Sequence, residues 1–312
     1  MTDGEGRATV RVPATSANLG AGFDCIGIAL DRVLSASVEA SHNLDSGGAA
    51  ITVRREGTLA SLEILPEDDA LYAGFAAGCA AGGRAVPAHL AFSVNSEIPV
   101  ARGLGSSSAA LVAGAKLADA ALSLGLGPLK LAELCTRLEG HPDNVAPAVF
   151  GGAILGVADT SGDTAQWVFL PIAVHPDLAF IFIIPPFTVE TFAARAILPR
   201  EVSHAIAVMA AGKSAALVQG LATGNGALLR VALDDVLHVP YRRDLVPGMA
   251  SVQDVARAAG AYGATLSGSG PTLVAIAPQE AANRVADAMK KQWSAAGVVA
   301  ETFVQRRPAT VG

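Results

Sequence analysis

The stretch that decides the fold is Asn95-Ser-Glu-Ile-Pro-Val-Ala-Arg-Gly-Leu-Gly-Ser-Ser-Ser-Ala-Ala110. An apolar run from Leu90 to Val94 precedes it and an apolar, alanine-rich segment from Ser107 to Leu124 follows, which predicts a strand, a glycine loop and a buried helix. The first N–H groups of a helix have no intrahelical partner, and the helix dipole is positive there. Such a loop can therefore hold a phosphate without a lysine.

The loop matches neither of two common nucleotide-binding patterns. A Walker A loop requires Gly-Lys-Ser/Thr, but Gly105 is followed by no lysine before Lys116. The Rossmann pattern is matched only in part, by Gly103, Gly105 and Ser108, and residues 122–130 resemble a helix end and a turn rather than the required acidic strand. A simple helix-capping turn remains an alternative for the loop alone, because serine commonly caps helices.

Length and composition favour a large folded protein with a sizeable buried interior over a nucleic-acid-binding protein. The chain has 312 residues, of which 51% are hydrophobic and 16% charged, which suits two domains or one large α/β unit. The net charge is −6 and the basic residues form only short pairs, so nucleic acid is excluded as the main partner.

The cysteines and the apolar runs predict a cytoplasmic protein without a membrane span. Cys25, Cys79 and Cys135 are odd in number and far apart, as expected for reduced thiols in the cytosol. The first residues are polar and lack the apolar core of a signal peptide. The strongest apolar run, Leu178 to Ile184, is too short to cross a bilayer and predicts a buried strand.

A first polar island lies near the start of the chain. Residues 8–12 predict a strand that ends at Pro13, followed by Pro13-Ala-Thr-Ser-Ala-Asn-Leu-Gly-Ala-Gly-Phe-Asp24. Asn18 and Asp24 there fit either Asx-turn chemistry or a binding role. Further strands are expected at 26–30, 33–38 and 51–53, with a hairpin turn at 45–48 and a helix at 71–81.

A second polar island follows a helix predicted from Gly127 to Leu138. It reads Glu139-Gly-His-Pro-Asp-Asn144 and stands between apolar segments. Clustered titratable groups in such surroundings are costly unless they find partners or a ligand, so the cluster predicts a functional site. A structural histidine is the alternative for His141 alone.

The second half of the chain begins, on this interpretation, after a turn at 159–165, which gives domains at 1–160 and 161–312. It contains expected strands at 167–170, 178–184, 272–277 and 298–304, helices at 203–223, 251–260 and 279–295, and a tail from Gln305 that is expected to be disordered. Thr191 and Arg195 stand one helical turn apart, and Arg242 lies among apolar residues that favour a buried partner. Ser267-Gly-Ser-Gly-Pro271 forms a second glycine-serine loop.

Three separated islands now stand together, and they resemble the superfamily of galactokinase, homoserine kinase, mevalonate kinase and phosphomevalonate kinase. The islands are Pro13 to Asp24, Pro99 to Ala110 with Glu139 to Asn144, and Ser267 to Pro271. The loop fits its P-x-x-x-G-L-G-S-S-x-A pattern, while P-A-T-S-A-N-L-G-x-G-F-D, E-G-H-P-D-N-V-A-P and L-S-G-S-G-P-T resemble homoserine kinases specifically. The resemblance covers nearly the whole chain. It implies ATP-dependent phosphorylation of the L-homoserine hydroxyl in threonine biosynthesis, and usually a homodimer. It also implies an α+β fold, with an N-terminal domain related to ribosomal protein S5 domain 2 and a ferredoxin-like C-terminal domain.

The resemblance also implies residue roles. The ATP phosphates would be wrapped by Pro99, Val100, Ala101, Arg102, Gly103, Leu104, Gly105, Ser106, Ser107 and Ser108. Mg²⁺ would be held by Ser107 and Glu139. Asp24 would bind the substrate ammonium and Arg195 and Arg242 its carboxylate, with Asn18, His141, Thr191 and Gly268 completing the pocket.

The resemblance places Asn144 where related kinases carry a catalytic aspartate. An amide cannot accept a proton, so the expected mechanism is positioning and charge stabilisation by Asn144, Glu139 and Ser107 without a general base. Asp143 is the competing base. The sequence departs from the family pattern at two places. His204-Ala-Ile-Ala-Val208 stands where the family often has D-A-V-x-N, so one polar contact is not predicted there. The helix start near Ala70 lacks a common asparagine, so the adenine contacts are not predicted.

Three other functions stay as alternatives at this point. A mevalonate or sugar kinase would leave Asp24 and the two arginines poorly used, because those substrates carry no ammonium. A catalytically silent nucleotide-binding regulator would be favoured by loss of Ser107 or Glu139, and both are present. An NAD-dependent oxidoreductase lacks the fingerprint acid.

Overall fold

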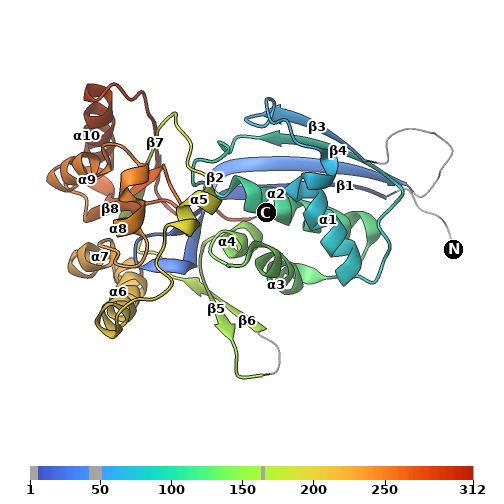
Figure 1. Cartoon of the computed structure of the whole chain (residues 1–312), viewed down its shortest axis with the longest axis horizontal. Coiled ribbons are helices and arrows are strands. Elements are labelled where there is room, and N and C mark those ends of the chain that lie inside the picture. The colour runs from blue at the N-terminus through green and yellow to red at the C-terminus, as the bar shows by residue number, and fades with distance from the viewer. Residues whose placement is uncertain (1–5, 42–50, 163–165, 312) are drawn as a thin grey trace.

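The computed structural model describes residues 6–41, 51–162 and 166–311. The hairpin turn predicted at 45–48 lies outside these residues. Two antiparallel-rich sheets organise the chain, each covered by helices (Figure 1). The first contains β1 (Gly6–Asn18), β2 (Gly22–Ser41), β3 (Ile51–Gly57), β4 (His89–Ser96), β5 (Ala153–Asp159) and β6 (Gln166–Ile172). The second contains β7 (Leu178–Ile184), β8 (Gly263–Leu266), β9 (Leu273–Pro278) and β10 (Glu301–Gln305).

Strand β2 is the central strand of the first sheet, because it pairs with β1, β4 and β5. The strand order is β3-β4-β2-β5-β6, with β1 also paired to β2. Residues 34–41 of β2 pair with β4, and residues 26–28 pair with β5. All of these pairings are antiparallel except β3 with β4, which is parallel. The long strand therefore runs from the outer end of the first sheet to the region where the two halves meet.

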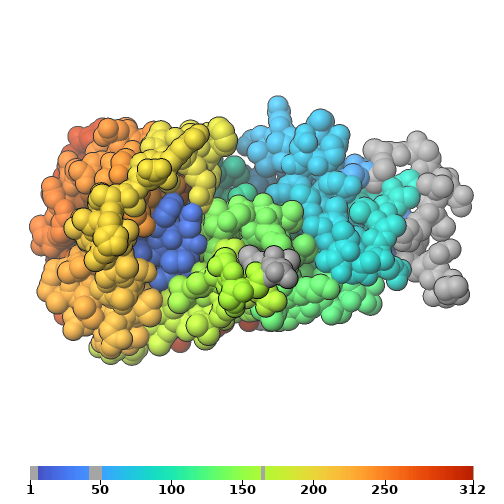
Figure 2. Space-filling model, turned by 60° about the horizontal axis from the view of Figure 1, so that its bottom comes forward, coloured from blue at the N-terminus to red at the C-terminus, as the bar shows by residue number. Residues whose placement is uncertain are grey.

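Strand β1 continues past Pro13, so the predicted strand end is wrong. The register shifts between Pro13 and Ala14, and pairing with β2 continues to Asn18. Among the described strands β1 pairs only with β2, and proline is tolerated in such an edge strand because its missing N–H faces no partner. The turn that follows docks on the second half, where the Ala21 N–H donates to the Ala232 carbonyl at 3.0 Å. Figure 2 shows these early residues, in blue, between later segments in yellow and green.

The helices of the first half cover one face of its sheet. They are η1 (Pro66–Asp68), α1 (Ala70–Ala81), α2 (Ser106–Leu122), α3 (Gly127–Glu139) and α4 (Val145–Phe150). Helix α2 is largely buried, as its apolar sequence predicts, and it packs backbone to backbone on α1. A Cβ atom on Gly114 would lie 1.9 Å from the Leu71 carbonyl oxygen, so only glycine permits this approach. The close packing holds the start of α2 rigidly beside the sheet.

The second sheet has the order β10-β7-β9-β8, with every pairing antiparallel. Its helical elements are α5 (Thr191–Ala196), α6 (His204–Thr223), α7 (Gly226–Ala232), α8 (Val239–Arg242), η2 (Arg243–Leu245), α9 (Met249–Ala258), η3 (Gln279–Ala281) and α10 (Ala282–Ala295). Helices α9 and α10 bury Val252, Met289 and Trp293 in a core shared with the sheet. All residues of β7 are buried, in agreement with its unbroken apolar sequence.

The turn at 159–165 does not separate the two sheets. Strand β6 pairs with β5 from Ile172 to Gln166, so the predicted turn connects two strands of one sheet. The chain passes to the second sheet only after Ile172. The division into domains at residue 160 stays a prediction, but the strand pairing places β6 with the first half.

The tail after Gln305 is ordered, so the expectation of disorder is wrong. The Ala309 N–H donates to the Ala29 carbonyl at 2.9 Å, and the Ala309 carbonyl accepts from the Gly152 N–H at 2.7 Å. Ala309 is buried. The last residues thus return to the first half, where Figure 1 places the C-terminal end.

Helix α6 stands out because it is apolar but mostly exposed. It is long and apolar enough to cross a membrane by length and composition alone, and only 22% of its most apolar window is buried. Val208 and Met209, in its first half, are 59% and 50% exposed. Exposed apolar surface of this kind marks a contact surface in a folded protein.

Candidate active site

A cavity of about 440 Å³ lies between the glycine-serine loop, α5 and the ends of α3 and β1. Its lining includes every residue that the sequence analysis assigned to the site except Pro99. Segments from distant parts of the chain, including Asn18, Glu139, Arg195 and Gly268, therefore meet in one place. The roles of these residues stay predictions, but their proximity gives those roles a common geometry.

The glycine-serine loop leads from β4 directly into α2. Gly103 and Gly105 have φ of 74° and 69°, and Gly105 is the N-cap of α2 without a side-chain capping hydrogen bond. The alternative of a serine-capped turn is therefore not what the loop forms. A Cβ atom on Gly103 would lie 2.2 Å from the Ser267 carbonyl oxygen, so the second glycine-serine loop rests directly against the first. The first N–H groups of α2 point to the cavity end of the helix, as an anion site requires.

Glu139 ends α3 beside the start of α2. The Ser108 hydroxyl donates to Glu139 Oε1 at 2.8 Å, and Ser108 is buried. Ser107, which the sequence analysis paired with Glu139, is exposed at the same helix start and lines the cavity. The two neighbouring serines thus differ, because one orients the carboxylate and the other presents its hydroxyl to the cavity.

His141 and Asp143 form a buried pair at the back of the cavity. Nδ1 of His141 lies 2.5 Å from Oδ1 of Asp143, and both residues are buried. Burial acts to lower the pKa of His141, but the hydrogen bond to Asp143 and the nearby carboxylates outweigh it, so this pKa is raised. Asp143 and His141 lie with Asp24 in a group whose ligand atoms are within 4.8 Å of one another.

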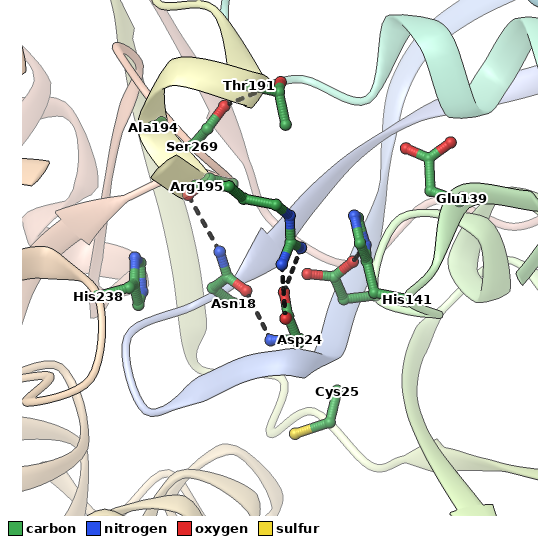
Figure 3. A network of polar contacts seen from close by, with 12 residues as sticks. Asn18, Asp24, Cys25, Glu139, His141, Thr191, Ala194, Arg195, His238 and Ser269 are labelled. Carbon is green, nitrogen blue, oxygen red and sulfur yellow. Dashed lines mark hydrogen bonds and ion pairs between the residues drawn. The ribbon is translucent and has the colours of Figure 1, made fainter. Parts of the chain in front are cut away.

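Asp24 and Arg195, which both line the cavity, are in direct contact (Figure 3). Arg195 donates from Nη1 to Asp24 Oδ2 at 3.0 Å and from Nη2 to Oδ1 at 2.7 Å, which is a bidentate pair. The hydrogen bond to Asp24 raises the pKa of Arg195. Asn18 braces this arrangement, since its Oδ1 accepts from the Asp24 N–H and its Nδ2 donates to the Gly268 carbonyl. Asn18 and Asp24 both have positive φ, which fits turns built around a site.

Arg242 is held more tightly than Arg195. Its Nε donates to the Ala194 carbonyl at 2.9 Å, and its Nη1 lies 3.1 Å from Nδ1 of His238. Its guanidinium carbon lies 5.5 Å from the centre of the Phe23 ring. Burial and the charge of Arg195 lower the pKa of Arg242 to about 10, so it remains charged at neutral pH.

His238 is fully buried and stacks on Phe23. Burial lowers its pKa to about 4, so the imidazole is neutral at pH 7 and Nδ1 can accept a hydrogen bond from Arg242. The Asp235 carboxylate caps the start of this segment by accepting from the N–H groups of His238 and Val239. The cluster fixes Arg242 before any ligand contact is made.

Sequence reasoning missed three contacts that support the site, and two of them are made by residues that it had not assigned, Thr15 and His238. Thr15 lies within the first polar island and donates to Asn144, Ser108 holds Glu139, and His238 holds Arg242. The one-turn spacing between His238 and Arg242 is a signal that could have been used. The other two contacts join positions far apart in the chain, for which a single sequence carries no signal.

Comparison with known proteins first defines the class. Residues 72–152 match the GHMP kinases N terminal domain and residues 214–295 the GHMP kinases C terminal family. The two-domain α+β fold and the glycine-serine loop are thus those of a GHMP kinase. The homoserine kinase of Picosynechococcus sp. is 40% identical to this chain, and the match covers 95% of each of the two sequences. The homoserine kinase of Moorella thermoacetica is 42% identical, and the match covers 86% of each sequence. The chain belongs to the homoserine kinase family.

Solved structures agree with this assignment. The crystal structure of homoserine kinase from Cytophaga hutchinsonii is 30% identical, has a TM-score of 0.82 and covers 100% of this chain and 96% of its own. Mevalonate kinase of L. major, at 17% identity and a TM-score of 0.65 over 97% of both chains, shares the fold. The expected fold class and family are both confirmed.

Proposed function

We propose that the chain transfers the γ-phosphoryl group of ATP to the side-chain hydroxyl of L-homoserine, forming O-phospho-L-homoserine and ADP. The observation that supports homoserine as the substrate is the presence of Asp24, Arg195 and Arg242 in the cavity that the phosphate loop also lines. One carboxylate and two guanidinium groups complement an amino acid that carries an ammonium and a carboxylate. Mevalonate and sugars offer no ammonium to such a site.

ATP binds along the loop from Pro99 to Ser108. The uncapped N–H groups at the start of α2 hold its phosphates. The cavity lining also includes Leu59, Leu62 and Ile64, and this apolar surface suits the adenine ring.

Ser107 and Glu139 are the residues that would hold Mg²⁺. Their hydroxyl and carboxylate oxygens are the ligands that this ion prefers, and both line the cavity beside the phosphate loop. When bound, the ion neutralises charge on the phosphate oxygens. The Ser108 hydroxyl donates a hydrogen bond to Oε1 of Glu139 and thereby fixes the orientation of the carboxylate, which leaves Oε2 for the ion.

Homoserine lies between the phosphate loop and the second half of the chain. Asp24 receives its ammonium group, and Arg195 and Arg242 receive its carboxylate. Asn18, His141, Thr191 and Gly268 complete the pocket. In this proposed arrangement the substrate hydroxyl faces Asn144, which lines the same cavity as the start of α2.

Phosphoryl transfer proceeds without a protein base. The homoserine oxygen forms a bond to the γ-phosphorus as the bond to the bridging oxygen of ADP breaks, and the hydroxyl proton passes to a phosphoryl oxygen. A loose transition state develops charge on the nucleophile late, so positioning by Asn144 suffices. Asp143 is the competing base, but one of its oxygens is already engaged by His141 at 2.5 Å. Asp143→Asn that retains normal turnover would eliminate this competitor, whereas selective loss of one limb of the pH profile would support it.

The enzyme acts as a cytoplasmic homodimer. The exposed apolar face in the first half of α6, around Val208 and Met209, is the surface that we assign to a second copy of the chain. No Lys, Arg, Asp or Glu lies between His204 and Gly212, so two copies of this face can meet without burying like charges.

The decisive experiment is ADP release with Mg-ATP and, separately, L-homoserine, L-serine, L-threonine, mevalonate and galactose. Stimulation by homoserine well above the other compounds is expected. Preferential stimulation by mevalonate or galactose would overturn the substrate assignment. ATP binding with no stimulation by any compound would instead favour the nucleotide-binding regulator.

A further inference from the structure

Thr15 lies directly behind the phosphate loop, outside the cavity lining. It is fully buried near the end of β1. Its backbone N–H donates to the Leu104 carbonyl at 3.1 Å, and its hydroxyl donates to Asn144 Oδ1 at 2.8 Å. A Cβ atom on Gly105 would lie 2.0 Å from the Thr15 hydroxyl oxygen, which shows how closely the loop rests on this residue. One buried threonine therefore joins the loop to Asn144.

Asn144 occupies the N-cap position of α4 but does not cap it. Asparagine at this position normally accepts a hydrogen bond from the first turn, yet no side-chain capping bond forms here. The side-chain oxygen is instead taken by Thr15. The hydrogen bond from Thr15 thus takes the place of a capping hydrogen bond to the first turn of α4. The Asn144 side chain is turned toward the cavity, whose lining includes this residue.

This contact also decides which end of the amide can act. An amide has one oxygen acceptor and one nitrogen that carries two donors, on opposite sides of a planar group. Thr15 uses one lone pair of the oxygen and holds that end of the amide against the loop, so the nitrogen, on the opposite side, is the end available to the reacting groups. Within the described residues, no hydrogen bond from Asn144 Nδ2 competes for it.

We propose that Thr15 is a positioning residue for phosphoryl transfer, which fixes the Asn144 amide with its nitrogen toward the reacting oxygens. The inference rests on the proposed function, in which Asn144 orients the substrate hydroxyl. An N–H donor at that oxygen keeps the hydroxyl proton directed away from the protein and toward the phosphoryl oxygens. Thr15 therefore makes the proton transfer to phosphate geometrically favourable and contributes to kcat rather than to binding.

The first test compares Thr15→Val with Thr15→Ser. Valine keeps the shape but removes the hydroxyl, so the amide can rotate, and we expect kcat to fall about tenfold. The KM values for ATP and homoserine should stay within about twofold, because the backbone bond to Leu104 is retained. Thr15→Ser restores the donor and should recover most of kcat. Wild-type kcat in Thr15→Val, or no recovery in Thr15→Ser, would overturn the proposal.

A double-mutant cycle separates positioning from general destabilisation. In an Asn144→Ala background, Thr15→Val should change kcat by less than about twofold, because the group that it positions is gone. An equal loss in both backgrounds would show that Thr15 acts only through folding. If Thr15→Val does not fold, Thr15→Cys provides the same comparison with a weak donor of similar size.

The matched control is Thr265→Val in β8. Thr265 is also fully buried in a strand, and its hydroxyl has no hydrogen-bond partner, so its loss should leave kcat unchanged. The cycle also separates this inference from the proposed function. Normal kcat in Asn144→Ala would refute the role of Asn144 itself, whereas a low kcat there with normal kcat in Thr15→Val would refute only the role of Thr15.

Discussion

The two arginines of the cavity are single residues with different surroundings. Arg242 is 2% exposed and held by Ala194 and His238, whereas Arg195 is half-buried and paired with Asp24. Because Nε and Nη1 of Arg242 are engaged by Ala194 and His238, the planar guanidinium is fixed, and Nη2 is the nitrogen left to donate to a carboxylate. Arg242 is therefore the more rigid of the two arginines that we propose as anchors for the substrate carboxylate.

Replacing Arg242 by lysine should weaken homoserine binding specifically. A point charge takes the place of the fork, so we expect the KM for homoserine to rise at least about tenfold, with the KM for ATP nearly unchanged. Steady-state kinetics with each substrate varied in turn measures this. Arg243→Lys, at the exposed neighbouring position, is the control and should behave as wild type. An unaltered homoserine KM in Arg242→Lys would remove Arg242 from the carboxylate site.

Glu139→Gln tests the assigned metal ligand. The amide keeps the size of the side chain but loses its charge, so kcat should fall about 100-fold or more while the fold is preserved. The rise in melting temperature produced by Mg-ATP over ATP alone should also be lost, which is a readout independent of turnover. Glu133→Gln, on the same helix and paired with Arg137 at the surface, is the control. A variant with normal activity at limiting Mg²⁺ would exclude the role.

His238 should make the protein less stable in acid. Its pKa is about 4 in the folded protein and near 6.5 in the unfolded chain, so between these values the unfolded chain binds more protons. The free energy of unfolding should therefore fall as the pH drops from 6.5 to 4, with a limiting slope of about 1.4 kcal/mol per pH unit. The charged groups around the imidazole are Asp235, Arg242 and Asp24.

Urea denaturation at several pH values measures this slope. His238→Asn keeps an acceptor for Arg242 but does not titrate, so the part of the slope due to His238 should disappear. The KM of this variant for homoserine at pH 7 should remain close to wild type. An unchanged pH dependence would mean that His238 does not control acid stability.

The ordered tail is an element whose contribution can be measured. Its backbone bonds link Ala309 to Ala29 in β2 and to Gly152 before β5. Deleting residues 308–312 removes both bonds and should lower the free energy of unfolding by about 1–3 kcal/mol. Urea denaturation of the truncated chain measures this, with Thr310→Ala, at an exposed position, as the control. Unchanged stability would show that the tail contributes nothing.

Elements with strong local signals were predictable from the sequence, and long-range pairings were not. The apolar run of β7 and the loop-to-helix transition at α2 both lie where the sequence predicts them. The tail was missed because it is held by backbone bonds that need no apolar pattern. The turn at 159–165 does not reveal which sheet receives the next strand, and only the strand pairing places β6 beside β5.

The candidate site was predictable to a similar extent. Its residue types and islands are visible in the sequence, and the structure brings all but Pro99 to one cavity. The bonds from Thr15 to Asn144 and from Ser108 to Glu139 span 129 and 31 positions, so only the fold reveals them. The sequence also suggested separate partners for Asp24 and Arg195, whereas the structure pairs them with each other.

At the scale of the whole molecule, the exposed face of α6 predicts the mode of self-association. Met209→Glu places a charge on each copy of the face, so we expect the proposed homodimer to dissociate into monomers. Val168→Glu, on the exposed side of β6, is the matched control and should remain dimeric. Light scattering after size exclusion measures both masses. A monomeric wild type, or a dimeric Met209→Glu variant, would contradict the assignment.

The bidentate pair between Asp24 and Arg195 gives the pocket zero net charge from these two groups. Homoserine also carries one charge of each sign, so its binding is an exchange of ionic partners that leaves the total charge of the pocket constant. We therefore expect its affinity to vary little with ionic strength, unlike that of a singly charged ligand. γ-Hydroxybutyrate, which has the carboxylate but no ammonium, would separate the pair without giving Asp24 a new partner. If Asp24 and Arg195 have the proposed roles, selection for an amino acid arises from an ion pair that only a zwitterion can replace on both sides.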